Sequence, residues 1–270
     1  MTGKGGVDMK VASKAVLITG ASSGIGWALA ENLAAKGARL ALLARRAGEL
    51  ERIAGQLTGK GAVAVAVPAD VTKPDEVGAA VEKAVGILGG LDMIVNNAGF
   101  GYFGTVAGMS MTDFDTMVKT NVYGLLHVTQ AAFPHLKRSK GMIVNVSSGL
   151  SKRTLPFLSA YVGTKSMVNT LSDGMRMELR KYGIRVLNYC PPEVDTGFAD
   201  RAKNEEGLEM PEDRRKRARV EDVAEDLARA IVAGKREVVK GKALMVMNLF
   251  APKLVDYIFY KAMVLKLSRD

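Results

Sequence analysis

The chain has 270 residues, of which 48% are hydrophobic and 24% charged, so it can bury a sizeable hydrophobic core. Its only cysteine, Cys190, excludes an intramolecular disulfide and a cysteine-rich zinc site, and its two histidines are too few for a His-rich metal site. We therefore expect no bound metal and a reducing, cytoplasmic environment. The sequence has no signal-peptide pattern and no apolar run of about 18 residues, so it predicts no membrane-spanning helix.

The net charge of +10, from 38 basic and 28 acidic residues, is compatible with an anionic partner. The densest basic block, residues 214–219, has no interleaved aromatic residues of the kind that stack on bases. We therefore interpret this block as a solvated loop, and we expect no nucleic-acid partner.

Apolar segments rich in β-branched residues alternate with segments of helical periodicity along most of the chain. The strand-like runs are residues 15–19, 38–44, 62–67, 91–95, 141–146 and 184–189. The helical patterns between them cover about 24–36, 46–57, 74–87, 112–136 and 159–181. This alternation predicts an α/β fold, a single doubly wound domain with a parallel sheet of about seven strands and helices on both faces.

Beyond Thr196 the alternation is lost. Residues 197–212 are typical of a polar loop or a short helix, and residues 220–233 of a further helix. Residues 243–267 combine apolar residues with lysines, as in a basic amphipathic helix that binds an anionic membrane surface. A tail that packs over a cleft or at a subunit interface has the same pattern, and both interpretations stay open.

A glycine-rich segment joins the first predicted strand to the first predicted helix. Residues 19–26 read Thr-Gly-Ala-Ser-Ser-Gly-Ile-Gly, which places glycines at positions 20, 24 and 26. At such a turn the backbone can approach a pyrophosphate, and the N-terminus of the helix attracts its negative charge. The spacing departs by one position from the usual dinucleotide fingerprint, so the segment needs support from the rest of the chain.

That support comes from the residues that follow the other predicted strands. They are Asp70-Val71, Asn96-Asn97-Ala98-Gly99, Ser147-Ser148 and the segment 191–196. The carboxyl ends of parallel strands are where ligands of open α/β sheets bind. Further along, Tyr161 and Lys165 are four positions apart, so a helix presents the phenol and the ammonium on one face.

Taken in order, these segments resemble the short-chain dehydrogenase/reductase family over residues 12–240. The resemblance implies a Rossmann domain at 1–240, with a substrate loop at 197–219, and a separate tail at 241–270. It also implies a catalytic tetrad of Asn121, Ser148, Tyr161 and Lys165. Ser148, rather than its neighbour Ser147, stands at the family's spacing from the tyrosine, and Ser147 should face the other way.

The implied roles suit the chemistry of carbonyl reduction. Hydride transfer to a carbonyl carbon leaves negative charge on oxygen, so a proton donor and a hydrogen-bond donor are needed there. Tyr161 would supply the proton, and Ser148 would hydrogen-bond the oxygen. Lys165 would lower the pKa of the phenol and bind the nicotinamide ribose, while Asn121 would hold a water that relays protons to Lys165.

The residues after the second predicted strand bear on the choice of cofactor. Ala44-Arg45-Arg46 stands where NAD-dependent members carry an acidic residue, and arginine pairs with a 2′-phosphate through its planar fork. We therefore expect NADP(H), with Arg45 as the first contact and Arg46 as either a second contact or a solvated helix start. The other cofactor contacts implied by the resemblance are Gly20, Ser22, Ser23, Gly24, Ile25, Gly26, Asp70, Val71, Asn97, Ala98, Gly99, Tyr161, Lys165, Pro191, Val194 and Thr196.

One departure bears on the substrate. Where most relatives carry Pro-Gly, this chain has Pro191-Pro192 followed by Glu193, and the run from Tyr189 to Phe198 is similar to that of 3-ketodihydrosphingosine reductases. This similarity suggests a long-chain 3-keto lipid, whereas a general reductase with a second proline is the alternative. Residues expected to line an apolar substrate pocket, or else to be plain core, are Phe100, Tyr102, Phe103, Leu155, Phe157 and Phe198.

The function expected from the sequence is an NADP(H)-dependent oxidoreductase acting on a carbonyl or secondary alcohol, with Tyr161 as acid and base. The alternatives are a 3-keto lipid reductase at a membrane surface and a non-catalytic nucleotide sensor on the same fold. Lys152 and Arg153 would either meet a substrate carboxylate or phosphate or lie in solvent. A homodimer or homotetramer would form through the helices at 112–136 and 159–181.

Overall fold

The computed structural model describes residues 11–198, 202–205, 208, 217–240 and 250–264. Residues 1–10, 199–201, 206–207, 209–216, 241–249 and 265–270 lie outside this description. They include more than half of the predicted substrate loop at 197–219, most of the basic block and part of the tail.

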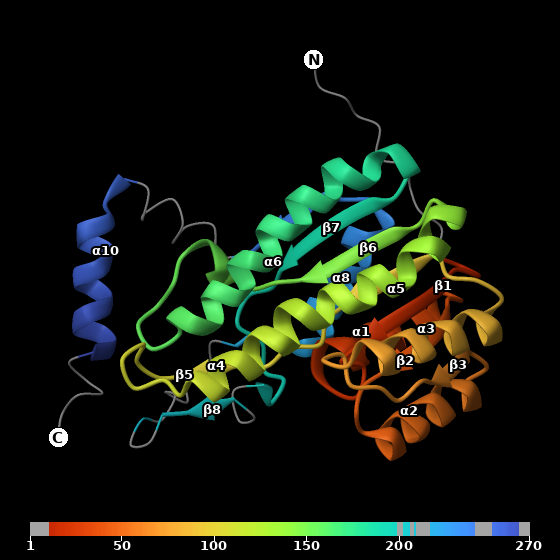
Figure 1. The fold of residues 1–270 in the computed structure, drawn as a ribbon, viewed down its shortest axis with the longest axis horizontal. Helices are drawn as coiled ribbons and strands as arrows, with labels where there is room; N and C mark the ends of the chain where they lie inside the picture. The colour runs from red at the N-terminus through yellow and green to blue at the C-terminus, as the bar shows by residue number, and fades with distance from the viewer. Residues whose placement is uncertain (1–10, 199–201, 206–207, 209–216, 241–249, 265–270) are drawn as a thin grey trace.

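The described residues form a seven-stranded parallel sheet (Figure 1). Its order is β3 (Val63–Ala66), β2 (Arg39–Leu43), β1 (Ala15–Thr19), β4 (Met93–Asn96), β6 (Met142–Val146), β7 (Arg185–Cys190) and β9 (Glu237–Val239). Six strands confirm the predicted runs, and β9 is the seventh, which the sequence did not locate. Strand order reverses between β1 and β4, and at such a point the loops diverge and leave a crevice for a ligand.

Helices cover both faces of the sheet, as expected for a doubly wound domain (Figure 1). One core packs α1 (Gly24–Ala35), α2 (Ala47–Gly59) and α8 (Val220–Val232) against one face. A second core packs α3 (Pro74–Leu88), α5 (Gly124–Ser139) and α6 (Ser159–Glu178) against the other. Within β1, Val16 and Ile18 belong to the first core and Ala15 and Leu17 to the second, because successive side chains of a strand point to opposite faces.

The helix predicted at 112–136 is not continuous. It consists of α4 (Met111–Val118), a π-helical turn η1 (Lys119–Tyr123) and α5. A Cβ on Gly124 would lie 2.7 Å from Cγ2 of Val71, so the glycine lets the start of α5 lie against the loop after β3. Wide turns of this kind occur often at functional sites, and this one carries Asn121.

The helix predicted at 159–181 is α6 followed by a 3-10 turn, η3 (Leu179–Tyr182). Gly183 ends this turn with φ of 74°, a left-handed conformation that glycine adopts without strain.

Smaller elements lie beyond the carboxyl edge of the sheet. A short 3-10 turn, η2 (Gly149–Lys152), follows β6, and β5 (Tyr102–Phe103) pairs in parallel with β8 (Lys203–Asn204). Of the loop or short helix predicted at 197–212, the structure describes residues 197–198, 202–205 and 208, and Lys203–Asn204 form β8. In the tail, α10 (Pro252–Phe259) and the turn η5 (Tyr260–Val264) stand apart from the sheet, on the side of β5 and α4 (Figure 1).

Candidate active site

The glycine turn lies at the point where the strand order reverses. Gly20 and Gly24 have φ of 64° and 56°, and a Cβ on Gly26 would lie 2.5 Å from the carbonyl oxygen of Gly20. The close approach of helix α1 to the turn therefore requires glycine at position 26. Ser23 is the N-cap of α1, but its side chain accepts no capping hydrogen bond, so its hydroxyl does not compete with an anion for the first N–H groups of the helix.

Two side chains hold this turn against the loop after β4. Asn97 Nδ2 donates to the carbonyl oxygens of Thr19 and Gly20, at 3.0 and 3.3 Å. Thr19 Oγ1 accepts from the backbone nitrogens of Asn97 and Ala98, at 2.9 and 3.0 Å. Sequence reasoning did not assign a role to the Thr19 side chain, although its place at the end of β1 was a signal for it.

The two arginines after β2 differ in their surroundings. Arg46 Nη2 donates to the carbonyl oxygen and to Oγ of Ser22, both at 3.0 Å, so its guanidinium lies beside the glycine turn. Arg45 is exposed at the same edge. Asp70 Oδ1 accepts from the backbone nitrogen and the hydroxyl of Thr72, both at 2.9 Å, and this shapes the loop that precedes α3.

Helix α6 presents Tyr161 and Lys165 on one face, next to the loop that carries Ser148. Burial raises the pKa of Tyr161 to about 12, and a hydrogen bond with the Ser148 hydroxyl acts in the opposite direction. Burial also lowers the pKa of Lys165 to about 8, and its Nζ donates to the carbonyl oxygen of Val146 at 3.0 Å. The pKa of Tyr161 is therefore raised and not lowered as expected, because desolvation of the phenol outweighs the hydrogen bond of Ser148.

Ser147 and Ser148 both contact α6, through different partners. Ser147 is buried, and its hydroxyl donates to the carbonyl oxygen of Lys165 at 3.0 Å. Ser148 is the N-cap of η2, where its Oγ accepts from the backbone nitrogen of Leu150 at 3.2 Å. Of the two serines, Ser148 is the one whose hydroxyl lowers the pKa of the Tyr161 phenol.

Asn121 is buried, and its side chain is fully engaged. Its Oδ1 accepts from the backbone nitrogen of Phe100 at 2.7 Å, and its Nδ2 donates to Phe100 O and to Thr164 Oγ1, both at 2.9 Å. The amide thus ties the loop after β4 to α6. A small cavity adjoins it, lined by Thr19, Val71, Asn96, Ala98, Asn121, Gly124, Leu125, Val146, Lys165 and Val168. A Cβ on Gly99 would lie 3.4 Å from Lys165 Nζ and 3.5 Å from Asn121 Oδ1, so the glycine fits closely between these groups.

The loop after β7 returns to the glycine turn. The carbonyl oxygen of Pro191 accepts from the backbone nitrogen of Gly149 at 2.7 Å. Glu193 pairs with Arg217 at 2.8 Å, and a backbone bridge joins Val194 to Ala218. Thr196 reaches Gly24, where a Cβ would lie 3.0 Å from the Cβ of Thr196. Thr196 thus lies beside the glycine turn, whereas Pro191 contacts η2 and Val194 pairs with Ala218.

Only some of the expected pocket residues face the site. The Phe198 ring lies against Tyr161, with centroids 5.6 Å apart. Tyr102 and Phe103 of β5 are buried and are therefore core residues. The Phe103 ring contacts the Phe157 ring, with centroids 5.5 Å apart. Phe100 and Leu155 are half-buried.

The two basic residues after Ser148 are paired within the chain. Lys152 Nζ lies 2.9 Å from Oε1 of Glu237, and Arg153 forms an ion pair with Asp256 of α10. Both expectations for them, a substrate anion or solvent, are therefore corrected. Tyr189, at the start of the double-proline run, is also structural, because its hydroxyl lies 3.0 Å from Asp226 Oδ2 of α8.

The described residues contain no group of three or more His, Cys, Asp or Glu side chains that could hold a metal ion. No helix in the described ranges is long and apolar enough to cross a membrane.

Comparisons with known proteins agree with this geometry. An uncharacterized oxidoreductase of Staphylococcus aureus is 33% identical over 223 residues, which cover 82% of this chain and 92% of the relative. A solved alcohol dehydrogenase of the archaeon Thermococcus sibiricus, complexed with 5-hydroxy-NADP, is 30% identical with a TM-score of 0.76, covering 84% of this chain and 95% of that one. A short-chain dehydrogenase/reductase of Burkholderia phymatum, in complex with NAD, is 25% identical with a TM-score of 0.81, covering 92% and 96%. The family model described as short chain dehydrogenase matches residues 14–207, and the chain therefore belongs to the short-chain dehydrogenase/reductase family of oxidoreductases.

Proposed function

We propose that the protein is an NADP(H)-dependent oxidoreductase that transfers hydride between the nicotinamide and a carbonyl or secondary alcohol carbon. The observation that carries this proposal is the placement of the Tyr161 phenol against Ser148, with buried Lys165 one helical turn away on α6. These groups stand at the same edge of the sheet as the glycine turn, where a cofactor would lie.

Each residue has a part in the proposed reaction. The cofactor supplies or accepts the hydride when bound. In the reducing direction Tyr161 donates a proton to the carbonyl oxygen, and Ser148 donates a hydrogen bond to the same oxygen. Lys165 holds a positive charge beside the phenol and binds the ribose hydroxyls. The small cavity next to Lys165 and Asn121 gives a water molecule a polar place from which to return the proton.

The choice of NADP(H) depends on charge at the end of β2. No aspartate or glutamate occurs between Arg39 and Gly48, so the position that binds a ribose 2′-hydroxyl in NAD sites has no carboxylate. Arg46 is already held beside the glycine turn, with Arg45 exposed next to it. Solved relatives are bound to NADP in a Burkholderia cenocepacia structure and to NAD in the Burkholderia phymatum structure. Because the relatives include both cofactors, the preference for NADP(H) in this chain depends on its two arginines.

The first experiment follows NADPH oxidation against short aldehydes and ketones, steroids, quinones and long-chain 3-keto amino alcohols, with NADH as the paired control. Tyr161→Phe should abolish turnover while NADPH still binds, because the ring remains and only the proton donor is lost. Full activity in this variant would contradict the mechanism. Tight NADPH binding by the wild type without turnover of any substrate would favour the alternative of a nucleotide sensor.

One observation favours the second candidate, a 3-keto lipid reductase at a membrane surface. Three exposed apolar residues of α10, Leu254, Tyr257 and Ile258, follow helical spacing and form one stripe, and Phe250, just before the helix, is exposed as well. Lys253 is exposed on the same helix, and Lys261 Nζ lies 4.9 Å from the centroid of the Tyr257 ring. The opposite side of α10 contacts the rest of the protein, since Val255 is buried and Asp256 pairs with Arg153, which follows η2. A lipid surface bound by this stripe would lie close to the substrate side of the site.

Vesicle sedimentation of the full chain tests this candidate. The wild type should bind vesicles of phosphatidylcholine with phosphatidylglycerol more strongly than vesicles of phosphatidylcholine alone. Ile258→Glu should lose the binding, whereas Ile87→Glu, at an isoleucine of α3 that is also exposed, should retain it. Equal sedimentation of both variants, or none by the wild type, would leave the general reductase as the remaining enzyme candidate.

The expected homodimer or homotetramer has support on the surface of the predicted helices. Met111, Tyr123, Met167 and Met177 are large exposed apolar residues on α4, η1 and α6. Exposed apolar residues on these elements favour contact with a second copy of the chain. Sedimentation velocity of the full chain measures the assembly, and a monomer at micromolar concentration would contradict it.

A further inference from the structure

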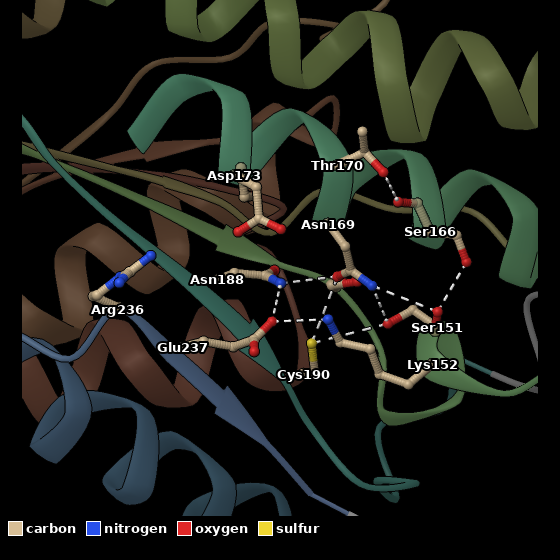
Figure 2. Close-up of polar contacts among 12 residues, drawn as sticks. Ser151, Lys152, Ser166, Asn169, Thr170, Asp173, Asn188, Cys190, Arg236 and Glu237 are labelled. Atoms are coloured by element: carbon tan, nitrogen blue, oxygen red, sulfur yellow. Dashed lines mark hydrogen bonds and ion pairs between the residues drawn. The ribbon is translucent and has the colours of Figure 1, made fainter. Parts of the chain in front are cut away.

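A network of polar side chains surrounds Asn169 (Figure 2). It joins four elements of the fold, η2, α6, β7 and β9, and its members are Ser151, Lys152, Ser166, Asn169, Asn188 and Glu237. Ser151 and Asn169 are buried and Asn188 has no exposed surface, so these hydrogen bonds form in a medium of low dielectric where they are strong. None of these residues has a role in the proposed reaction.

The network holds the loop of the catalytic serine to the helix of the catalytic tyrosine. Ser151 Oγ donates to the carbonyl oxygen of Ser148 and accepts from Asn169 Nδ2, the latter at 2.8 Å. The carbonyl oxygen of Ser151 accepts from Ser166 Oγ at 2.9 Å. Ser166 and Asn169 belong to α6, which also carries Tyr161 and Lys165. One residue, Ser151, is therefore held at two atoms by α6 and itself holds the backbone of Ser148.

The far side of the network orients the Asn169 amide. Asn188 Nδ2 donates to Asn169 Oδ1 at 2.9 Å and to Glu237 Oε1 at 3.1 Å. Glu237 is in turn held by Lys152 Nζ at 2.9 Å. Because Oδ1 of Asn169 receives a hydrogen bond from Asn188, its Nδ2 must face Ser151. The strand β9, which the sequence did not locate, thus contributes to the geometry of the catalytic loop.

We propose that Asn169 and Ser151 are positioning residues, which hold the loop of Ser148 against α6 so that the Ser148 hydroxyl faces the Tyr161 phenol. The inference depends on the proposed function, because that function gives Ser148 and Tyr161 their roles. Without the network, the loop of Ser148 is tied to α6 less tightly, and its hydroxyl spends less time against the phenol. Small misplacements of catalytic groups lower rates strongly, by about 100-fold for roughly 1 Å.

A matched pair of variants separates positioning from stability. Ser151→Ala removes a buried hydroxyl that donates to Ser148 O and accepts from Asn169 Nδ2. Ser172→Ala removes a hydroxyl of α6 with the same pattern, since Ser172 donates to Val168 O at 2.7 Å and accepts from Asn145 Nδ2 at 2.9 Å. Both serines are buried. Of the two, Ser151 is the one that bonds to Ser148. Each variant should therefore lose a similar stability.

The expected kinetic result differs between the two. Ser151→Ala should lower kcat by about tenfold to 100-fold, while the KM for NADPH stays unchanged because the glycine turn is untouched. Ser172→Ala should change neither kcat nor the KM for NADPH. Equal losses of kcat in both variants, or an unchanged Ser151→Ala, would overturn the proposal.

A second variant and a crystal structure complete the test. Asn169→Leu should lower kcat as Ser151→Ala does, and the double variant should be little worse than either, because both act along one line of hydrogen bonds. Additive losses would overturn the proposal. Crystal structures of Ser151→Ala and Ser172→Ala require no substrate, and Ser148 should move away from Tyr161 only in the former. If the wild type turns over no substrate, the proposed function fails, and this structural comparison alone decides whether Ser151 positions Ser148.

Discussion

The cofactor side and the substrate side of this protein are built in different ways. The cofactor side consists of loops that directly follow neighbouring strands. Its hydrogen bonds run largely to backbone atoms, as from Asn97 to the Thr19 and Gly20 carbonyl oxygens. The substrate side is assembled by side-chain pairs between distant segments, such as Arg153 with Asp256 and Lys203 with Asp113. The first leaves little freedom for substitution, whereas the second can vary without disturbing the sheet.

The largest expected effect breaks the cofactor side. Gly26→Ala places a Cβ 2.5 Å from Gly20 O, so the turn must open and the N-terminus of α1 must move away from the pyrophosphate. We expect NADPH affinity to fall by about 100-fold, close to 3 kcal/mol. Isothermal titration with NADPH measures the loss.

The control is Gly55→Ala on α2, where a Cβ has no heavy atom within 4 Å. It should retain NADPH affinity and gain up to about 1 kcal/mol of stability through its better helix propensity. Unchanged affinity in Gly26→Ala would show that the turn is not the pyrophosphate site.

The next effect sharpens the comparison by testing charge at the cofactor side. Arg46→Ala should weaken NADPH binding by about tenfold, or 1.4 kcal/mol, and leave NADH binding unchanged, because only NADPH carries the 2′-phosphate. Arg45→Ala should act in the same direction. Titration with both nucleotides measures the difference.

Arg52→Ala is the matched control, since Arg52 is an exposed arginine of α2 paired with Glu49 at 2.6 Å. It should leave both affinities unchanged. Equal weakening of NADH and NADPH by Arg46→Ala would indicate that Arg46 supports the glycine turn through Ser22 and does not read the phosphate.

A third prediction concerns Lys165, which lies where the two sides meet. Burial lowers its pKa to about 8, so the ammonium is present below this pH and is lost above it. With NADPH saturating, kcat/KM for reduction should be level below about pH 8 and then fall, approaching tenfold per pH unit, because the charge beside Tyr161 disappears. Circular dichroism over the same pH range checks that the fold is retained. A level profile up to about pH 10 would contradict this role of Lys165.

The smallest effect is expected on the substrate side. Asp256→Ala removes the ion pair with Arg153, of which the Asp256 side is largely exposed, so the free energy of unfolding should change by less than about 1 kcal/mol. We expect KM for the carbonyl substrate to change by only a few fold and NADPH affinity to stay constant. Denaturant unfolding and steady-state kinetics measure both. A loss of NADPH affinity would contradict the separation of the two sides.

Much of the fold and of the candidate site follows from the sequence by itself, because the determining chemistry is local. Apolar strands with helices between them specify a parallel sheet, whose carboxyl edge gathers the loops that follow each strand. Gly26 and the spacing from Tyr161 to Lys165 likewise depend on neighbours along the chain. These features locate the glycine turn and the face of α6 before any coordinate is known.

Only the tertiary structure decided the features that join distant segments. The strand β9 is three residues long and becomes recognisable through its pairing with β7. The π-helical turn at Asn121 appears within a continuous helical pattern, and its amide is bound to Phe100 from another loop. The pairing of Arg153 with Asp256 joins residues 103 positions apart in the sequence. The contact of Ser151 with Asn169 joins residues 18 positions apart. Such contacts depend on where the chain returns in space, which periodicity and spacing along the sequence do not encode.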